Sequence, residues 1–232
     1  MDFQGVEHRV ATIRAGIADA VRRGGHGQQV RLIAVTKTHG PEAVLAAAAA
    51  GITDVGENKV QEATSKQDAL TAAGTMPAGL TWHLIGHLQT NKVKALPRFG
   101  LFHAMDRPKL ANEAASMAAA RGLTLDVLMQ VNIVGEETKG GYELAAVAAE
   151  AERWREMPSL RVRGVMTMAP FDAPESVLRE VFRGARAARE TLRAAGHPAD
   201  ELSMGMSGDY LIAVEEGATM VRLGTVLFGA RG

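Results

Sequence analysis

Lys37 is the residue whose type and position bear most directly on chemistry. It immediately follows the apolar run 30–36, which predicts a buried strand, so its amine would lie at a strand end. Burial disfavours the charged ammonium form, and a neutral amine can condense with an aldehyde. The alternative at this position is a lysine that extends its amine to solvent from the end of a strand.

Two turns of small residues near the end of the chain predict an anion site. Ser207 belongs to the run 202–209, and Gly224 and Thr225 belong to the run 220–225; in both runs an apolar strand passes into a helix. Backbone N–H groups at such a junction, together with hydroxyl groups, bind phosphate. Either turn alone could be an ordinary tight turn, but the two together favour a phosphate site.

Arg222 lies two residues before Gly224, so both residues would share one face of a strand. Its guanidinium could pair with a neighbouring carboxylate, or it could donate to a ring nitrogen of a bound heterocycle. By residue type alone, Met204 and the other methionines at 166, 168 and 206 are packing residues of the same region.

Metal binding is not predicted. His83 and His87 are four residues apart, but the run around His83 is typical of a strand, and no glutamate follows in the pattern of a zinc helix. The chain has no cysteine, which excludes disulfides, thiolate nucleophiles and Cys-ligated metals.

Two kinds of segment alternate along the chain. Short apolar runs rich in β-branched residues predict strands at 30–36, 53–56, 81–85, 101–105, 125–133, 162–168, 201–204 and 220–223. Longer runs with apolar residues at helical spacing predict helices at 6–23, 42–50, 59–73, 89–96, 109–120, 143–156, 175–194 and 209–216.

The order of these segments predicts an α/β fold, a single (β/α)8 TIM barrel with an extra N-terminal helix. We expect one domain over residues 1–232, because no Ser- or Pro-rich hinge divides the chain. The alternative is a doubly wound open sheet, which would need a G-x-G-x-x-G turn after its first strand. The turn at 36–41 lacks that pattern. In a barrel, the functional site lies at the C-terminal ends of the strands.

Composition narrows the class of partner. The 26 basic and 26 acidic residues balance, so no electrostatic footprint for nucleic acid or an anionic membrane is expected. No apolar run approaches the roughly 20 residues of a membrane-spanning helix, and the N-terminus does not resemble a signal peptide. We therefore expect a cytoplasmic protein, and a monomer because no segment indicates an obligate interface.

Several motifs together resemble one known family. They are AVTKT (34–38), GENKVQE (56–62), WHLIGHLQTNK (82–92), LSMGMS (202–207), VRLGT (221–225) and FGAR (228–231). The chain is identified by them as similar to the pyridoxal phosphate homeostasis proteins, which are small relatives of the alanine racemase barrel. The matching motifs run nearly end to end.

This resemblance implies a cofactor, pyridoxal 5′-phosphate (PLP), and a role for each matching residue. Lys37 would form the internal aldimine, Ser207, Gly224 and Thr225 would hold the phosphate, and Arg222 would face the pyridine nitrogen. Asn58, His83 and Met204 lie in motifs expected around the cofactor. Lys139, in the loop after the fifth strand, is an accessory candidate that matches a second lysine of the family.

The resemblance also implies a carrier of the cofactor in PLP homeostasis, not an enzyme with established turnover. The partners would be PLP and apo-enzymes that receive it. The alternative is an amino-acid racemase, which needs a second base and usually a second domain; the chain ends directly after the last barrel unit, and Tyr142 and Tyr210 match no such base. A lysine-dependent aldolase is a third reading, in which a substrate carbonyl would meet Lys37.

Overall fold

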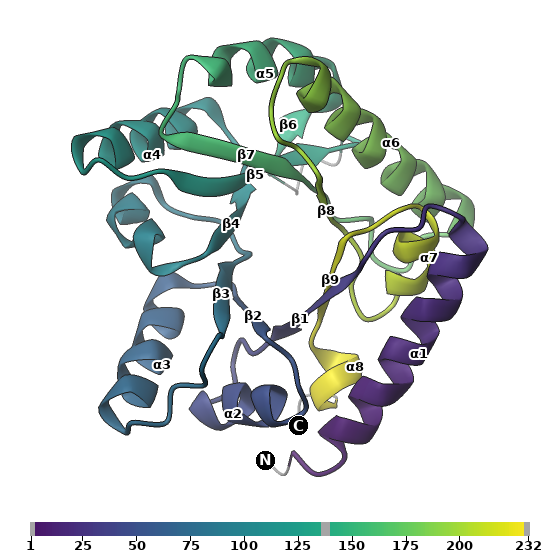
Figure 1. Ribbon diagram of the computed structural model, residues 1–232. Coiled ribbons are helices and arrows are strands. Elements are labelled where there is room, and N and C mark those ends of the chain that lie inside the picture. The colour runs from purple at the N-terminus through teal and green to yellow at the C-terminus, as the bar shows by residue number, and fades with distance from the viewer. Residues whose placement is uncertain (1–2, 136–139, 230–232) are drawn as a thin grey trace.

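The computed structural model describes residues 3–135 and 140–229. Within them, eight parallel strands close into a barrel, seen in Figure 1 as a ring of arrows surrounded by helices. The strands are β1 (Arg31–Val35), β2 (Asp54–Glu57), β3 (Thr81–Leu84), β4 (Leu101–Met105), β5 (Leu125–Asn132), β7 (Leu160–Met166), β8 (Glu201–Ser203) and β9 (Met220–Leu223). Each pairs with the next in this order, and β9 pairs with β1, which closes the ring. The predicted barrel is confirmed.

Helices cover the outside of the ring. They are α1 (Val6–Gly24), α2 (Pro41–Ala49), α3 (Val60–Ala72), α4 (Pro108–Ala120), α5 (Val147–Arg155), α6 (Glu175–Ala194), α7 (Tyr210–Glu215) and α8 (Thr225–Phe228). The extra N-terminal helix, α1, lies beside α7 and α8 (Figure 1). No helix in the described ranges is long and apolar enough to cross a membrane.

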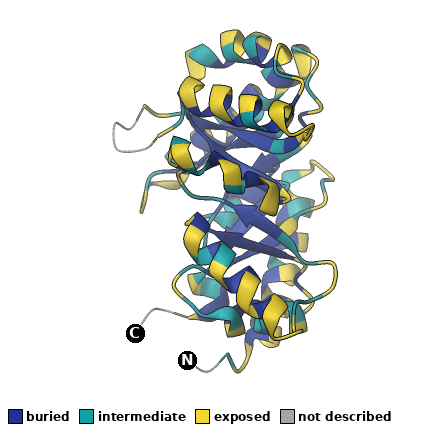
Figure 2. Ribbon diagram, turned by 90° about the vertical axis from the view of Figure 1, so that its left-hand side faces the viewer, coloured by how far each residue is buried: buried dark blue, intermediate teal, exposed yellow. Residues whose placement is uncertain are grey.

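Apolar periodicity explains which faces are buried. Every residue of β2, β4 and β9 is buried, as expected for strands covered on one face by helices and on the other by the barrel interior. In α6, the buried residues recur at helical spacing, from Leu178 through Phe182 and Ala185 to Leu192. Figure 2 shows the result, with dark blue strands inside and yellow outward faces on the helices.

Two local predictions were inexact. The run 89–96 forms a 3-10 helix, η1 (Thr90–Arg98), which contains Pro97; proline lacks the N–H that an α-helix interior needs. In the run 143–156, only Val147–Arg155 is α-helical, because Tyr142–Glu143 (β6) pairs with the end of β5 and a 3-10 turn, η2 (Leu144–Ala146), follows. The helix expected after the run 220–225 is present as α8, which follows the eighth barrel strand.

Candidate functional site

A cavity of about 700 Å³ lies at the C-terminal ends of the strands. Its volume is within the range of small-molecule sites, about 300–1,000 Å³. Of the residues predicted at the cofactor, six line it: Lys37, Asn58, Ser207, Arg222, Gly224 and Thr225. His83 and Met204 are fully buried and are not part of the cavity wall. Lys139 lies outside the described residues.

Lys37 enters the cavity from the turn that follows β1. The turn is unusual because Thr38 has φ of +69°, a left-handed backbone that a branched side chain rarely adopts. Three hydrogen bonds hold the residues on either side of Lys37. Thr36 Oγ1 donates to Glu57 at 2.5 Å, Lys66 Nζ donates to the Thr36 carbonyl at 2.8 Å, and the Thr38 N–H donates to Glu62.

A buried ion cluster therefore supports the Lys37 turn. Lys66 Nζ lies 2.6 Å from Glu57 Oε1 and 2.9 Å from Glu62 Oε1, with the Lys66 side chain 5% exposed and that of Glu57 fully buried. Burial raises the pKa of the Glu57 carboxyl, although hydrogen bonds from Lys66 and Thr36 oppose it. For Glu62, burial also raises the pKa, but the hydrogen bonds from Lys66 and the Thr38 N–H outweigh it and the net pKa is lowered.

The two small-residue turns build another part of the cavity wall. In the first, the Met206 N–H donates to Asp209 Oδ1 at 2.5 Å, which closes the turn that presents Ser207. The two turns touch, because the Val226 N–H donates to Ser207 Oγ at 3.3 Å. The predicted anion-binding residues at 207, 224 and 225 therefore share one corner of the cavity.

Two glycines allow close approaches around the cavity. Gly205 has φ of +95°, and a Cβ there would lie 2.7 Å from Ala213 Cβ and 2.9 Å from Tyr210 Cα. At Gly86, a Cβ would lie 2.3 Å from the carbonyl oxygen of Asn58. Only glycine lets these backbones meet, which explains its place in the motifs LSMGMS and WHLIGHLQ.

Arg222 lies in the cavity wall with a buried guanidinium. Its two terminal nitrogens donate to Ser203 Oγ at 2.6 Å and to the Thr167 carbonyl at 2.9 Å. Burial lowers the pKa of this guanidinium to about 10, an effect that the charge of Asp209 partly opposes. The side chain therefore remains cationic at neutral pH and is held in one orientation.

Other groups in the wall were not predicted as binding residues. His87 Nδ1 lies 2.7 Å from Asp106 Oδ2, and Gln130 Nε2 donates to the Gly140 carbonyl at 2.5 Å. Phe171 lines the cavity, and its side chain is 97% exposed. His87 and Asp106 follow predicted strands, a signal that could have selected them; Phe171 has no such signal in the sequence.

The structure also shows the positions of His83 and His87, the two histidines that are four residues apart. His83 is bonded inside the barrel to Asp54 and His103, whereas His87 pairs with Asp106 at the cavity. Within the described ranges, no cluster of three or more histidine and carboxylate side chains forms a potential metal site.

Comparison with known proteins shows which family this chain belongs to. The family described as "Alanine racemase, N-terminal domain" matches residues 9–232. The pyridoxal phosphate homeostasis protein of Aquifex aeolicus is 41% identical over 227 residues, which cover 96% of this chain and 97% of the relative. The chain belongs to the alanine racemase N-terminal domain family, among the pyridoxal phosphate homeostasis proteins.

Solved structures of similar proteins agree with this family assignment. A protein from Bifidobacterium adolescentis is 34% identical, with a TM-score of 0.90 over 98% of this chain and 97% of its own. PipY of Synechococcus elongatus, solved with PLP bound, is 35% identical, with a TM-score of 0.84 over 97% of this chain and 100% of its own. The family predicted from the motifs is confirmed.

Proposed function

We propose that this chain binds PLP in the cavity at the C-terminal ends of the strands and holds it as a Schiff base on Lys37. One observation carries the proposal. Lys37, Arg222 and Ser207 come from distant parts of the sequence, yet they line the same cavity. The homeostasis proteins that resemble this chain carry PLP in their name, and the PipY structure contains it.

The residues present fit the three reactive or polar parts of PLP. The amine of Lys37 suits its aldehyde: a C=N bond forms, and the aldehyde oxygen leaves as water. The hydroxyls of Ser207 and Thr225, beside the backbone at Gly224, suit a phosphate. The guanidinium of Arg222 is a donor only, and so suits an unprotonated pyridine nitrogen.

This donor set favours a carrier over an enzyme. PLP stabilises carbanions as an electron sink, best with a protonated ring nitrogen, which a permanently charged Arg222 disfavours. A racemase needs a second base, and neither of the chain's two tyrosines, Tyr142 and Tyr210, lines the cavity. Burial also raises the pKa of both phenols, so even less of either is present as the phenolate base at neutral pH.

The cellular role that we propose is PLP homeostasis in the cytoplasm, by a monomer that shields the aldehyde and releases it to apo-enzymes. Release is chemically available because another amine can displace Lys37 from the Schiff base by exchange. Sedimentation of the purified protein would measure its oligomeric state directly.

Absorbance spectroscopy tests the binding proposal. Protein incubated with PLP and then freed of excess cofactor should show a Schiff-base band, and borohydride reduction should attach the cofactor's mass to the peptide that contains Lys37. The Lys37→Ala variant should lose both signals. Lys94→Ala is the matched control, because Lys94 is exposed on η1 and is not part of the cavity wall. Equal loading of the Lys37 variant would exclude Lys37 as the attachment point.

Transfer to an apo-enzyme tests the carrier role. The loaded protein is mixed with a PLP-dependent apo-enzyme in the presence of a reagent that captures free aldehyde. Recovery of enzyme activity despite the trap would support direct delivery. Recovery only without the trap would show that the protein buffers free PLP, and turnover of an amino acid by the loaded protein alone would favour the racemase.

A further inference from the structure

A continuous row of buried polar side chains crosses the barrel interior and ends at Arg222. Asp54 Oδ1 lies 2.9 Å from His83 Nε2, and His83 Nδ1 lies 2.9 Å from His103 Nε2. His103 Nδ1 lies 2.8 Å from Ser203 Oγ, which accepts from Arg222 at 2.6 Å. All five residues are less than 10% exposed.

Strand register explains how residues so far apart in sequence meet. Asp54 pairs with Thr81, and His83 is two residues further along β3; His83 pairs with Leu101, and His103 is two residues further along β4. Likewise, Ser203 pairs with Met220, and Arg222 is two residues further along β9. Because strand side chains alternate between faces, each step of two keeps the next member inside the barrel.

The two ends of the row fix the direction of its first and last hydrogen bonds. Arg222 can only donate, and an ionised Asp54 can only accept. Ser203 therefore accepts from Arg222, and it donates its hydroxyl hydrogen to Nδ1 of His103 when that ring is neutral and bare at Nδ1. His103 then donates from Nε2 to Nδ1 of His83, and His83 donates from Nε2 to Asp54. Both histidines are neutral in this arrangement, and both carry their hydrogen on Nε2.

The burial of the row agrees with a neutral His103. Burial lowers the pKa of His103 well below its usual value. Burial by itself would raise the pKa of Asp54, but hydrogen bonds from His83 and Thr53 outweigh it and the net pKa is lowered. Asp54 is therefore ionised at neutral pH and remains an acceptor.

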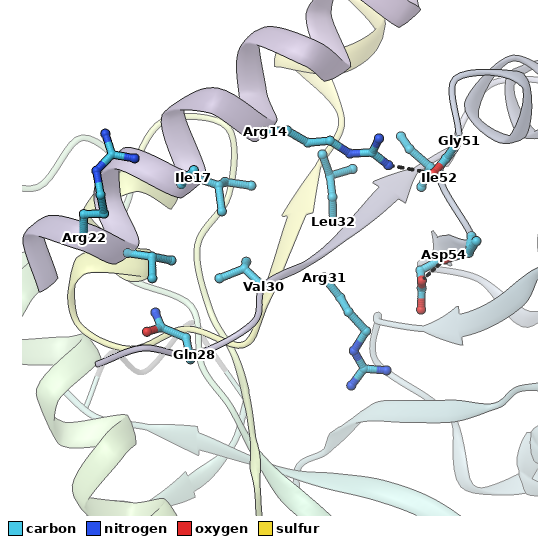
Figure 3. A pocket seen from close by; sticks show the side chains of 13 residues that line it. Arg14, Ile17, Arg22, Gln28, Val30, Arg31, Leu32, Gly51, Ile52 and Asp54 are labelled. Carbon is cyan, nitrogen blue, oxygen red and sulfur yellow. Dashed lines mark hydrogen bonds between the residues drawn. The ribbon is translucent and has the colours of Figure 1, made fainter. Parts of the chain in front are cut away.

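The row joins two hollows of the molecule. A groove of about 590 Å³ lies between α1 and the N-terminal ends of β1 and β2, and Asp54 is part of its wall (Figure 3). Arg31 from the adjacent strand and Arg14, which donates to the Gly51 carbonyl, line the same groove. The side chain of Asp54 is 10% exposed there, whereas Arg222 ends the row in the wall of the PLP cavity.

We propose that Asp54, His83, His103 and Ser203 are positioning residues that hold Arg222 toward the pyridine ring through a one-directional hydrogen-bond chain. The proposal deepens the PLP-binding function and rests on it for the ring partner of Arg222. These four residues touch no cofactor; they act through the guanidinium. Cooperative polarisation along such a chain strengthens each bond, so a break at any link should reach Arg222.

Nitrogen-15 NMR of the cofactor-free protein tests the hydrogen-bond chain itself. The side-chain signals of His83 and His103 should both show a hydrogen on Nε2 and a bare Nδ1, and His103 should keep that form between pH 8 and pH 6. Assignment follows from the His83→Gln and His103→Gln variants, which each remove one set of signals. A hydrogen on Nδ1 of either ring, or a charged imidazolium at pH 7, would overturn the inference.

Binding measurements test the positioning role. Ser203→Ala removes the acceptor of Arg222, and we expect about tenfold weaker PLP binding and a displaced absorption maximum, as for loss of a hydrogen bond to a charged group. Ser159→Ala is the matched control, because Ser159 is also buried but donates to the Ala115 carbonyl, away from the cavity. It should bind PLP like the wild type.

At the Asp54 end of the hydrogen-bond chain, a conservative substitution should rescue PLP binding. Asp54→Ala should weaken PLP binding, whereas Asp54→Asn should retain most of it, because the amide oxygen can still accept from His83. Equal binding by Ser203→Ala and Ser159→Ala, or by Asp54→Ala and the wild type, would refute the positioning role. If the wild type itself fails to bind PLP, the proposed function is wrong. The NMR signals of the two histidines still decide whether the hydrogen-bond chain exists.

Discussion

Removal of the buried Lys66 charge is the sharpest test of how the Lys37 turn is held. In Lys66→Met, Glu57 loses its only cation within 4 Å among the described residues, and the Thr36 carbonyl loses a donor. Breaking a buried ion pair by removing one partner costs about 3–5 kcal/mol. We expect the free energy of unfolding to fall by about that amount, because both side chains are at most 5% exposed.

The pH dependence of this loss follows from Glu57. Burial already raises its pKa, and removal of Lys66 would raise it further. A carboxyl whose pKa is higher in the folded state contributes stability below its unfolded pKa and loses that contribution as pH rises. The deficit of Lys66→Met relative to the wild type should therefore be larger at pH 8 than at pH 5, as measured by urea unfolding.

A double variant separates stability from positioning. Replacement of a whole buried pair by apolar residues is often close to neutral, so Glu57→Leu with Lys66→Met should recover most of the lost stability. PLP binding by the double variant should be weak, since Thr36 has lost both of its side-chain partners, Glu57 and Lys66. Lys59→Met, at an exposed position on the same segment, is the control. A Lys66→Met variant within about 0.5 kcal/mol of the wild type, or full binding by the double variant, would refute this account.

Two further outcomes follow from the structure. Gly205→Ala should destabilise the protein by about 1–3 kcal/mol in thermal unfolding, because φ at Gly205 is +95° and the new Cβ would meet Ala213 and Tyr210. Gly208→Ala is the control and should be nearly neutral, because a Cβ there would have nothing within 4 Å. Equal melting temperatures of the two variants would contradict the role of Gly205. The pKa of His103 is lowered in the folded state, so below about pH 6.5 the unfolded chain binds a proton that the folded chain does not. In that range His103 should remove about 1.4 kcal/mol of unfolding free energy per pH unit. The slope of unfolding free energy against pH should be shallower by that amount in His103→Gln, and an unchanged slope would count against a neutral His103.

Local patterns in the sequence predicted most of the fold and part of the candidate site. Apolar periodicity and β-branching are properties of single segments, so the alternation of strands and helices could be read without tertiary information. Lys37, Ser207 and Thr225 were found because each stands where a predicted strand or its following turn ends. In a parallel barrel those positions all lie at one end, and the structure does place them around one cavity.

The residues that support the site were beyond such reasoning. Lys66 lies within a helix, and only the packing of α3 against the barrel brings its amine to Glu57 and Thr36. His103 lies inside a strand, 100 residues from its partner Ser203. Their meeting depends on the register of each strand against the next and on closure of the ring. The physical reason is that packing of the whole sheet sets this register, so no single segment encodes which inward-facing side chains will touch.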